Sequence, residues 1–155
     1  MTPDSILMSV RPQYAEKILR GEKTVELRRV RPRVSRGDVI VMYVTSPKSE
    51  VRALLEVEEV LEAHPAALWS AVGSTAGVSI GEYEEYFQGS GTGVGISLRV
   101  VEHLKEPVTL DELRAMSPGF RPPQSYRYIA GLTCRMQSLF TSLWKKSRTR
   151  APAAS

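Results

Sequence analysis

Three charged side chains at close spacing form the part of the sequence best suited to chemistry. Lys23, Glu26 and Arg28 follow Gly21 directly in the segment GEKTVELR. A carboxylate can act as a general base, while a lysine and an arginine can stabilise the negative charge of a phosphate or an oxyanion. This spacing indicates a polar site for an anionic ligand. The simpler interpretation is an ordinary surface ion pair at a helix–strand corner.

The elements that must position these residues have clear sequence signals. A proline followed by apolar residues at helical spacing predicts a short helix over 12–20, and Gly21 is typical of a helix end. In the next segment, 23–29, apolar and polar residues alternate as they do in a half-buried strand. We therefore expect Glu26 and Arg28 to share one face of that strand.

The rest of the chain is rich in short strand signals. Apolar or alternating runs predict further strands over residues 5–10, 39–44, 51–60 and 93–101. The sum is an α+β fold: a mixed, mostly antiparallel sheet curled into a small β-barrel with flanking short helices. We assign residues 1–130 to this domain. Residues 131–155 then form a C-terminal extension, an amphipathic helix followed by a basic disordered tail that begins near Ser147.

Composition limits the classes of function that need to be considered. The chain has 155 residues with one cysteine and two histidines, so it offers neither an internal disulfide nor a metal-ligand spacing. No run is long enough to span a membrane, and the N-terminus lacks a signal-peptide pattern. We expect a cytoplasmic protein without metal or cofactor. Ser90–Gly95 is glycine-rich, but it precedes a predicted strand, so a hairpin is a better interpretation than a phosphate-binding loop.

Basic residues gather in two regions of the chain. Seven lysines and arginines lie between Arg20 and Arg36 against two glutamates, and no acid follows Glu112. Such polarity favours partners that carry phosphate. A nucleic acid, either RNA or DNA, fits this expectation. The alternative from another class is a module that binds an acidic protein.

The C-terminal extension leaves three uses open. It carries an apolar stripe at helical spacing and ends in Lys145 and Lys146. The stripe would pack on the domain, dock a partner or lie on an anionic membrane surface, and packing is the default expectation. The basic end would strengthen nucleic-acid binding in a salt-dependent way in each case.

The segment GEKTVELR also resembles the signature of a known family. Gly21, Lys23 and Arg28 match the Gly-x-Lys-x-x-x-x-Arg pattern that follows a short helix in the ASCH domain. Four further segments agree with it: SVRP at 9–12, ELRR at 26–29, YVTSP at 43–47 and RPPQSY at 121–126. Over roughly residues 6–129 the chain is similar to the PUA-like branch described as predicted transcriptional regulators.

This resemblance implies a small β-barrel that binds RNA or a nucleotide. Lys23, Arg28 and Arg29 would then meet phosphate or a base edge, and Glu26 would orient Arg28 or accept from a base. The other implied ligand-binding residues lie after the central strand and near the end of the domain: Thr45, Ser46, Gln124, Ser125 and Tyr126. We expect from this a regulatory RNA-binding domain.

Some proteins of this type are enzymes, which gives an alternative function. In a ribonuclease Glu26 would serve as general base and Lys23 as electrostatic stabiliser, so these two are the candidate catalytic residues. Other relatives remove acetyl groups from acetylated cytidine with a lysine, a threonine and a glutamate. Here Glu26 stands at the threonine position, and no acid lies between Gly73 and Ile80. The sequence therefore disfavours deacetylation.

Overall fold

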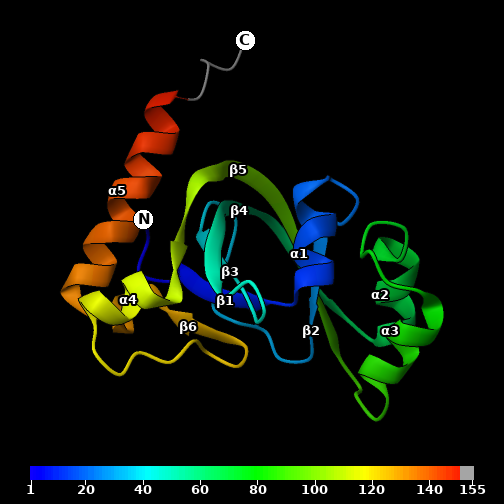
Figure 1. Cartoon of the computed structure of the whole chain (residues 1–155). Coiled ribbons are helices and arrows are strands. Elements are labelled where there is room, and N and C mark those ends of the chain that lie inside the picture. Colours follow the sequence, from blue (N-terminus) through cyan, green and yellow to red (C-terminus); the bar gives the residue numbers. More distant parts are fainter. Residues whose placement is uncertain (151–155) are drawn as a thin grey trace.

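A computed structural model describes residues 1–150 of the chain (Figure 1). The strands within this range are β1 (Ile6–Val10), β2 (Val25–Arg28), β3 (Val39–Val44), β4 (Glu50–Ala63), β5 (Gly93–Thr109) and β6 (Tyr126–Tyr128). The helices are α1 (Pro12–Leu19), α2 (Pro65–Val72), α3 (Ile80–Phe87), α4 (Leu110–Met116) and α5 (Cys134–Arg150), with one 3-10 turn at Ile129–Gly131. None of these helices is long and apolar enough to cross a membrane.

The six strands form one curled sheet in the order β2-β5-β4-β3-β1-β6. Strand β1 runs parallel to β3, while every other neighbouring pair is antiparallel. The long strands β4 and β5 slip register at three places, and such bulges increase the local twist of a sheet. The predicted α+β fold with a mixed, mostly antiparallel and strongly curled sheet is confirmed.

The two faces of the sheet carry separate apolar clusters. Alternation along β1 sends Ile6 and Met8 to the inner face, which α1 covers with Ala15 and Ile18. Leu7 belongs to the outer face, which α4 and α5 cover. Helices α2 and α3 form a third cluster against β2 (Figure 1). The chain between α1 and β2 therefore lies where the inner face meets the α2–α3 pair.

Helix α5 covers the outer face with the apolar stripe that the sequence predicts. Met136, Phe140 and Trp144 are buried in the same cluster as β1 and β3. The expectation that the chain becomes disordered at Ser147 is wrong, because the helix continues to Arg150. Ser147 is buried and its hydroxyl donates to the Trp144 carbonyl at 2.7 Å, which stabilises one more turn. The predicted disorder of residues 151–155 lies outside the described residues.

Candidate functional site at the seam of the sheet

Strands β2 and β6 are the two edges of the sheet, and the curl brings them together at a seam closed by side chains. Arg28 in β2 donates from Nη1 to the Ser125 hydroxyl, just before β6, at 2.7 Å. Its Nη2 donates to the Ser9 carbonyl in β1 at 3.4 Å. Ser9 in turn donates its N–H to the Ser125 carbonyl at 2.9 Å. The side chain of Arg28 thus links one edge strand of the sheet, β2, to the chain next to the other edge strand, β6.

Glu26 and Arg28 place an ion pair on the apolar inner face. Their cross-strand partners in β5 are Ile96 and Val94, both buried in the inner cluster. The side chains of Glu26 and Arg28 are only 12% and 15% exposed, and Arg28 Nη2 lies 3.7 Å from Glu26 Oε1. A buried pair contributes little net stability, because desolvation offsets most of the attraction. The predicted sharing of one strand face by these two residues is confirmed.

Two polar atoms of this pair have no hydrogen-bond partner. Glu26 Oε2 and Arg28 Nε are both buried and unsatisfied. Buried polar groups almost always find partners, and leaving one unpaired costs about 1–3 kcal/mol. One carboxylate oxygen and one guanidinium nitrogen of this ion pair therefore keep hydrogen-bonding capacity that the fold does not use.

Lys23 is buried against the linker between α2 and α3. Its side chain is 3% exposed, and its ammonium donates to the Ala76 carbonyl. Burial lowers the pKa of Lys23, while the nearby charge of Glu26 opposes that shift. Although Lys23 and Glu26 are close enough to interact, the ion pair of Glu26 is with Arg28, and Lys23 is held by a neutral carbonyl.

A second lysine makes the same kind of contact one residue further along the linker. Lys17 donates from Nζ to the Gly77 carbonyl at 2.9 Å. Gly77 has a φ of +68°, and a Cβ atom there would lie 2.8 Å from Lys23 Cβ. The backbone of the linker can approach Lys23 so closely because residue 77 is a glycine. The two lysines thereby hold the start of α3 beside the seam.

The structure adds two residues that the sequence reasoning missed. Tyr14 in α1 donates its hydroxyl to Glu82 Oε2 in α3 at 3.1 Å. The Lys23 ammonium lies 5.4 Å from the centre of the Tyr14 ring, and Glu82 is close enough to act on the pKa of Lys23. Glu82 follows Ser79 by three residues, which is the spacing of a capping box, and the structure contains that capping box. Glu82 is thus a second carboxylate near Lys23, in addition to Glu26. It lies just after residues 73–80, a segment that contains no acid.

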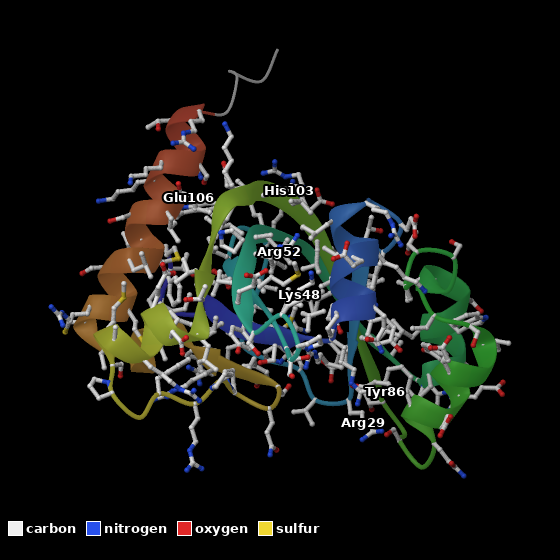
Figure 2. The ribbon with its side chains drawn as sticks, in the orientation of Figure 1. Arg29, Lys48, Arg52, Tyr86, His103 and Glu106 are labelled. Atoms are coloured by element: carbon white, nitrogen blue, oxygen red, sulfur yellow. The ribbon has the colours of Figure 1, made fainter. Side chains whose placement is uncertain are left out.

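The basic loop between β2 and β3 is largely occupied by internal contacts. The Arg29 guanidinium lies 4.5 Å over the Tyr86 ring and donates to the Tyr86 carbonyl at 2.7 Å; Figure 2 shows the two side by side. Arg31 pairs with Glu62 at 3.6 Å. The loop therefore presents less free positive charge than its composition suggests.

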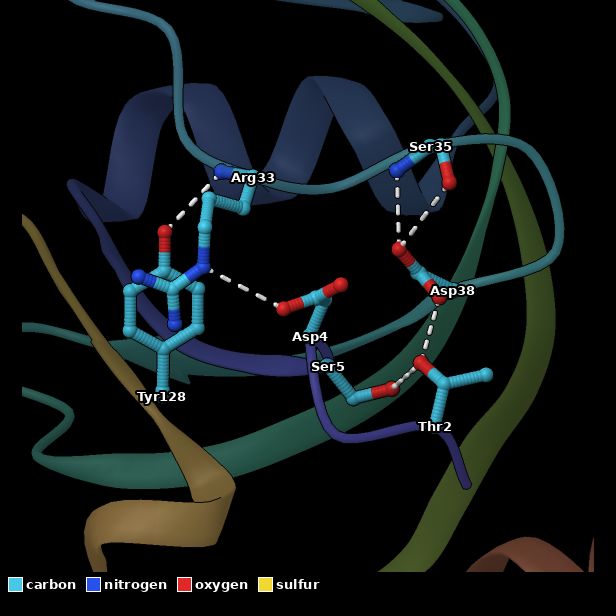
Figure 3. A network of polar contacts seen from close by, with 7 residues as sticks. All are labelled: Thr2, Asp4, Ser5, Arg33, Ser35, Asp38 and Tyr128. Atoms are coloured by element: carbon cyan, nitrogen blue, oxygen red, sulfur yellow. Dashed lines mark hydrogen bonds and ion pairs between the residues drawn. The ribbon is translucent and has the colours of Figure 1, made fainter.

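The far end of the same loop is held by a polar network (Figure 3). Arg33 lies 4.0 Å over the Tyr128 ring of β6, and its Nε pairs with Asp4 at 3.3 Å. Asp38 accepts from the Ser35 N–H at 2.8 Å and from the hydroxyl of Thr2. The loop is thus fixed at both sides of the seam.

Among the remaining predicted site residues, Tyr126 lies beside the charged residues of the seam, whereas Thr45, Ser46 and Gln124 make no side-chain hydrogen bond to them in the described part of the chain. Tyr126, directly after Ser125, pairs with Met8 of β1. Burial raises the pKa of Tyr126, and the nearby charge of Arg28 opposes that shift. Thr45 donates its N–H to the Val10 carbonyl at the ends of β1 and β3. Within the described residues no side-chain hydrogen bond joins Thr45, Ser46 or Gln124 to the charged residues at the seam. The structure therefore gathers Lys23, Glu26, Arg28 and Ser125, which we call the seam cluster.

Comparison with known proteins identifies the family. The model of the ASCH domain matches residues 8–107. The chain belongs to the ASCH domain family. The predicted resemblance to the ASCH domain is confirmed. The seam cluster contains Lys23 and Arg28, the two charged residues on which that resemblance was based.

Individual relatives of this ASCH chain agree with the assignment. A protein of Zymomonas mobilis named "ASCH domain-containing ribonuclease" is 32% identical over 123 residues, covering 79% of this chain and 82% of the relative. The crystal structure of ASCH from Zymomonas mobilis superposes with a TM-score of 0.79 at 30% identity, covering 92% and 96% of the two chains. An NMR structure of a Rhodopseudomonas palustris protein has a TM-score of 0.50 at 14% identity and supports the fold alone.

Proposed function

We propose that this ASCH chain binds RNA at the seam cluster and cleaves its phosphodiester bonds there. The observation that carries the proposal is the unpaired couple of Glu26 Oε2 and Arg28 Nε. A buried base next to a buried cation suits a reaction that removes a proton and builds negative charge on phosphorus. RNA binding is common to the regulatory and the enzymatic alternatives. The name of the 32% identical relative favours the enzyme.

The reaction that fits these groups is attack by the RNA on its own backbone. Glu26 takes the proton of a ribose 2′-hydroxyl, and the 2′-oxygen then bonds to the adjacent phosphorus. The bond from phosphorus to the 5′-oxygen breaks, that oxygen takes a proton from water, and a 2′,3′-cyclic phosphate remains. The guanidinium charge of Arg28 stabilises the extra negative charge of the pentacoordinate phosphorus.

In this proposal Lys23 holds the linker between α2 and α3 in place and supplies positive charge near Glu26. Its ammonium is held by the Ala76 carbonyl, so it contributes positive charge beside Glu26 without needing to contact the RNA. Together with Lys17 it fixes the linker that brings Glu82 and Tyr86 of α3 to the site. We therefore assign Lys23 as a positioning residue and Glu26 as the catalytic base.

The test compares cleavage of a single-stranded RNA by the wild type and by Glu26→Gln. The amide keeps the shape of the side chain but accepts a proton poorly, so we expect cleavage to fall about 10²- to 10⁴-fold. Glu59→Gln, an exposed carboxylate on β4, is the matched control and should cleave as the wild type does. RNA with 2′-O-methyl groups should bind without being cleaved.

Two outcomes would decide against cleavage. Full activity in Glu26→Gln would remove the proposed base from the mechanism. A wild type that binds RNA tightly but leaves it intact would instead support the regulatory binding function.

A further inference from the structure

We propose that the exposed basic end of α5 is a second RNA-binding surface, which holds phosphates outside the seam. The inference rests on the proposed function, since it supposes the same RNA ligand. The surface comprises Lys145, Lys146, Arg148 and Arg150, all of which are exposed. It lies outside the segment 8–107 that matches the family.

The charge of this helix is unbalanced in a way that no other described helix repeats. Helix α5 contains no aspartate or glutamate in its 17 residues. Among the described residues none of the four cations has an acidic partner within ion-pair distance. Arg148 lies 5.5 Å over the Trp144 ring, a contact that leaves its N–H groups free. Four sets of charged donors are therefore available to a ligand.

A purely structural role accounts for only part of this pattern. Cations in the last turn of a helix offset the negative end of its dipole. That effect is electrostatic and leaves the N–H donors of the lysine and arginine side chains without a hydrogen-bond partner. It falls off within the last turn, whereas Lys145 lies more than a turn before Arg150.

The apolar side of the helix decides against a membrane as the partner. Helices that lie on bilayers insert an apolar face beneath a cationic one. In α5 that face is occupied, because Met136, Phe140 and Trp144 pack on the outer face of the sheet. What remains exposed at the C-terminal end is charge, and a linear polyanion satisfies charge without needing an apolar anchor.

The spacing of the cations fits a polynucleotide backbone. Lys146 and Arg150 are one turn apart, which is about 6 Å along the helix axis. Each nucleotide of a strand adds one phosphate, so neighbouring cations on this helix can meet different phosphates of one strand. In Figure 1 α5 and the α2–α3 pair lie on opposite sides of the sheet. An RNA must therefore be long to reach both the seam and this surface.

The experiment measures how the affinity for RNA depends on salt. The variant carries Lys145→Gln, Lys146→Gln, Arg148→Gln and Arg150→Gln. The matched control carries Arg20→Gln, Arg31→Gln and Arg99→Gln, which replace three exposed arginines that pair with glutamates. The ligand is a long 2′-O-methyl uridine homopolymer. Each phosphate contact contributes about 0.7 to the log–log slope, so four lost contacts should make it shallower by about 3. The control should change it by less than about 1.

Four outcomes overturn the inference or separate it from the proposed function. An unchanged slope in the α5 variant would remove this surface from RNA binding. Loss of binding to phosphatidylserine vesicles with unchanged RNA affinity would show that the surface meets membranes instead. Cleavage of a trinucleotide should be equal in the α5 variant and the wild type, since so short a substrate reaches only the seam. A wild type that binds the homopolymer with the expected slope but cleaves no RNA would refute the proposed function alone and would support the surface.

Discussion

Two basic regions of this chain have similar composition and opposite surroundings. The arginines of the β2–β3 loop meet partners from distant parts of the chain, Tyr86, Glu62, Asp4 and Tyr128. The cations at the end of α5 have no acidic partner among the described residues. The same residue type fastens the protein in the first region and is free to bind in the second.

The difference arises from where each segment lies in the fold. The β2–β3 loop crosses the seam, where β6, α3 and the N-terminus converge and provide acids and aromatic rings. The C-terminal end of helix α5 extends past the strands (Figure 1), and no acidic side chain of the described residues pairs with its cations. The number of charges in a segment thus predicts its attraction for an anionic ligand only if the charges that pair within the protein are left out of the count.

The largest effect should come from the arginine that closes the seam. Arg28→Met leaves the Glu26 carboxylate buried without its ion pair, which costs about 3–5 kcal/mol. Urea unfolding of the purified variant measures the loss. The double variant Glu26→Leu with Arg28→Met should recover most of it, since it removes both buried charges. An exposed ion pair contributes at most about 1 kcal/mol. If Arg28→Met loses less than that, the pair of Arg28 and Glu26 contributes no more to stability than an exposed pair does.

Lys23 should give a pH-dependent effect of intermediate size. Burial lowers its pKa below the ordinary 10.5, so between the folded and unfolded pKa values the unfolded chain binds more protons. The free energy of unfolding of the wild type should therefore rise with pH through that window, relative to Lys23→Met. Urea titrations of both proteins from neutral pH to about 10.5 test this. Parallel curves would mean that the Lys23 ammonium is not desolvated.

The smallest effects should separate the two basic regions directly. Arg29→Gln removes a cation–π contact with Tyr86 and should cost about 0.5–1 kcal/mol of stability. Lys146→Gln removes an exposed, unpaired charge and should stay within about 0.5 kcal/mol of the wild type. Thermal unfolding of both variants, side by side, provides the comparison. Equal losses would erase the distinction between the two regions.

Local patterns in the sequence were enough to predict most of the fold. The helix over 12–20, the alternating strand after Gly21 and the apolar stripe of the C-terminal helix all depend on neighbours within a few residues. The helix end at Ser147 was misplaced, because the buried hydroxyl bond of that residue depends on packing against the sheet. The short polar run beyond Trp144 carries no local sign of that burial.

The site was predicted only where its residues are close in sequence. Glu26 and Arg28 could be paired from strand alternation, whereas Ser125 is 97 residues away from Arg28 and reaches it through the curl of the sheet. Tyr14 and Glu82 were hidden for a similar reason, since each has a sufficient local explanation in its own helix. Tertiary contacts of this kind have no local sequence signal when each partner is common in its own element.

The most direct measurement of the central claim is an NMR titration with a short 2′-O-methyl RNA, which binds without being cleaved. The account predicts that the backbone amide signals of Glu26, Arg28 and Ser125 shift together and progressively as RNA is added. The signals of β4, which carries several acidic residues, should stay in place. Shifts confined to β4, or spread over the surface without including the seam cluster, would contradict the account.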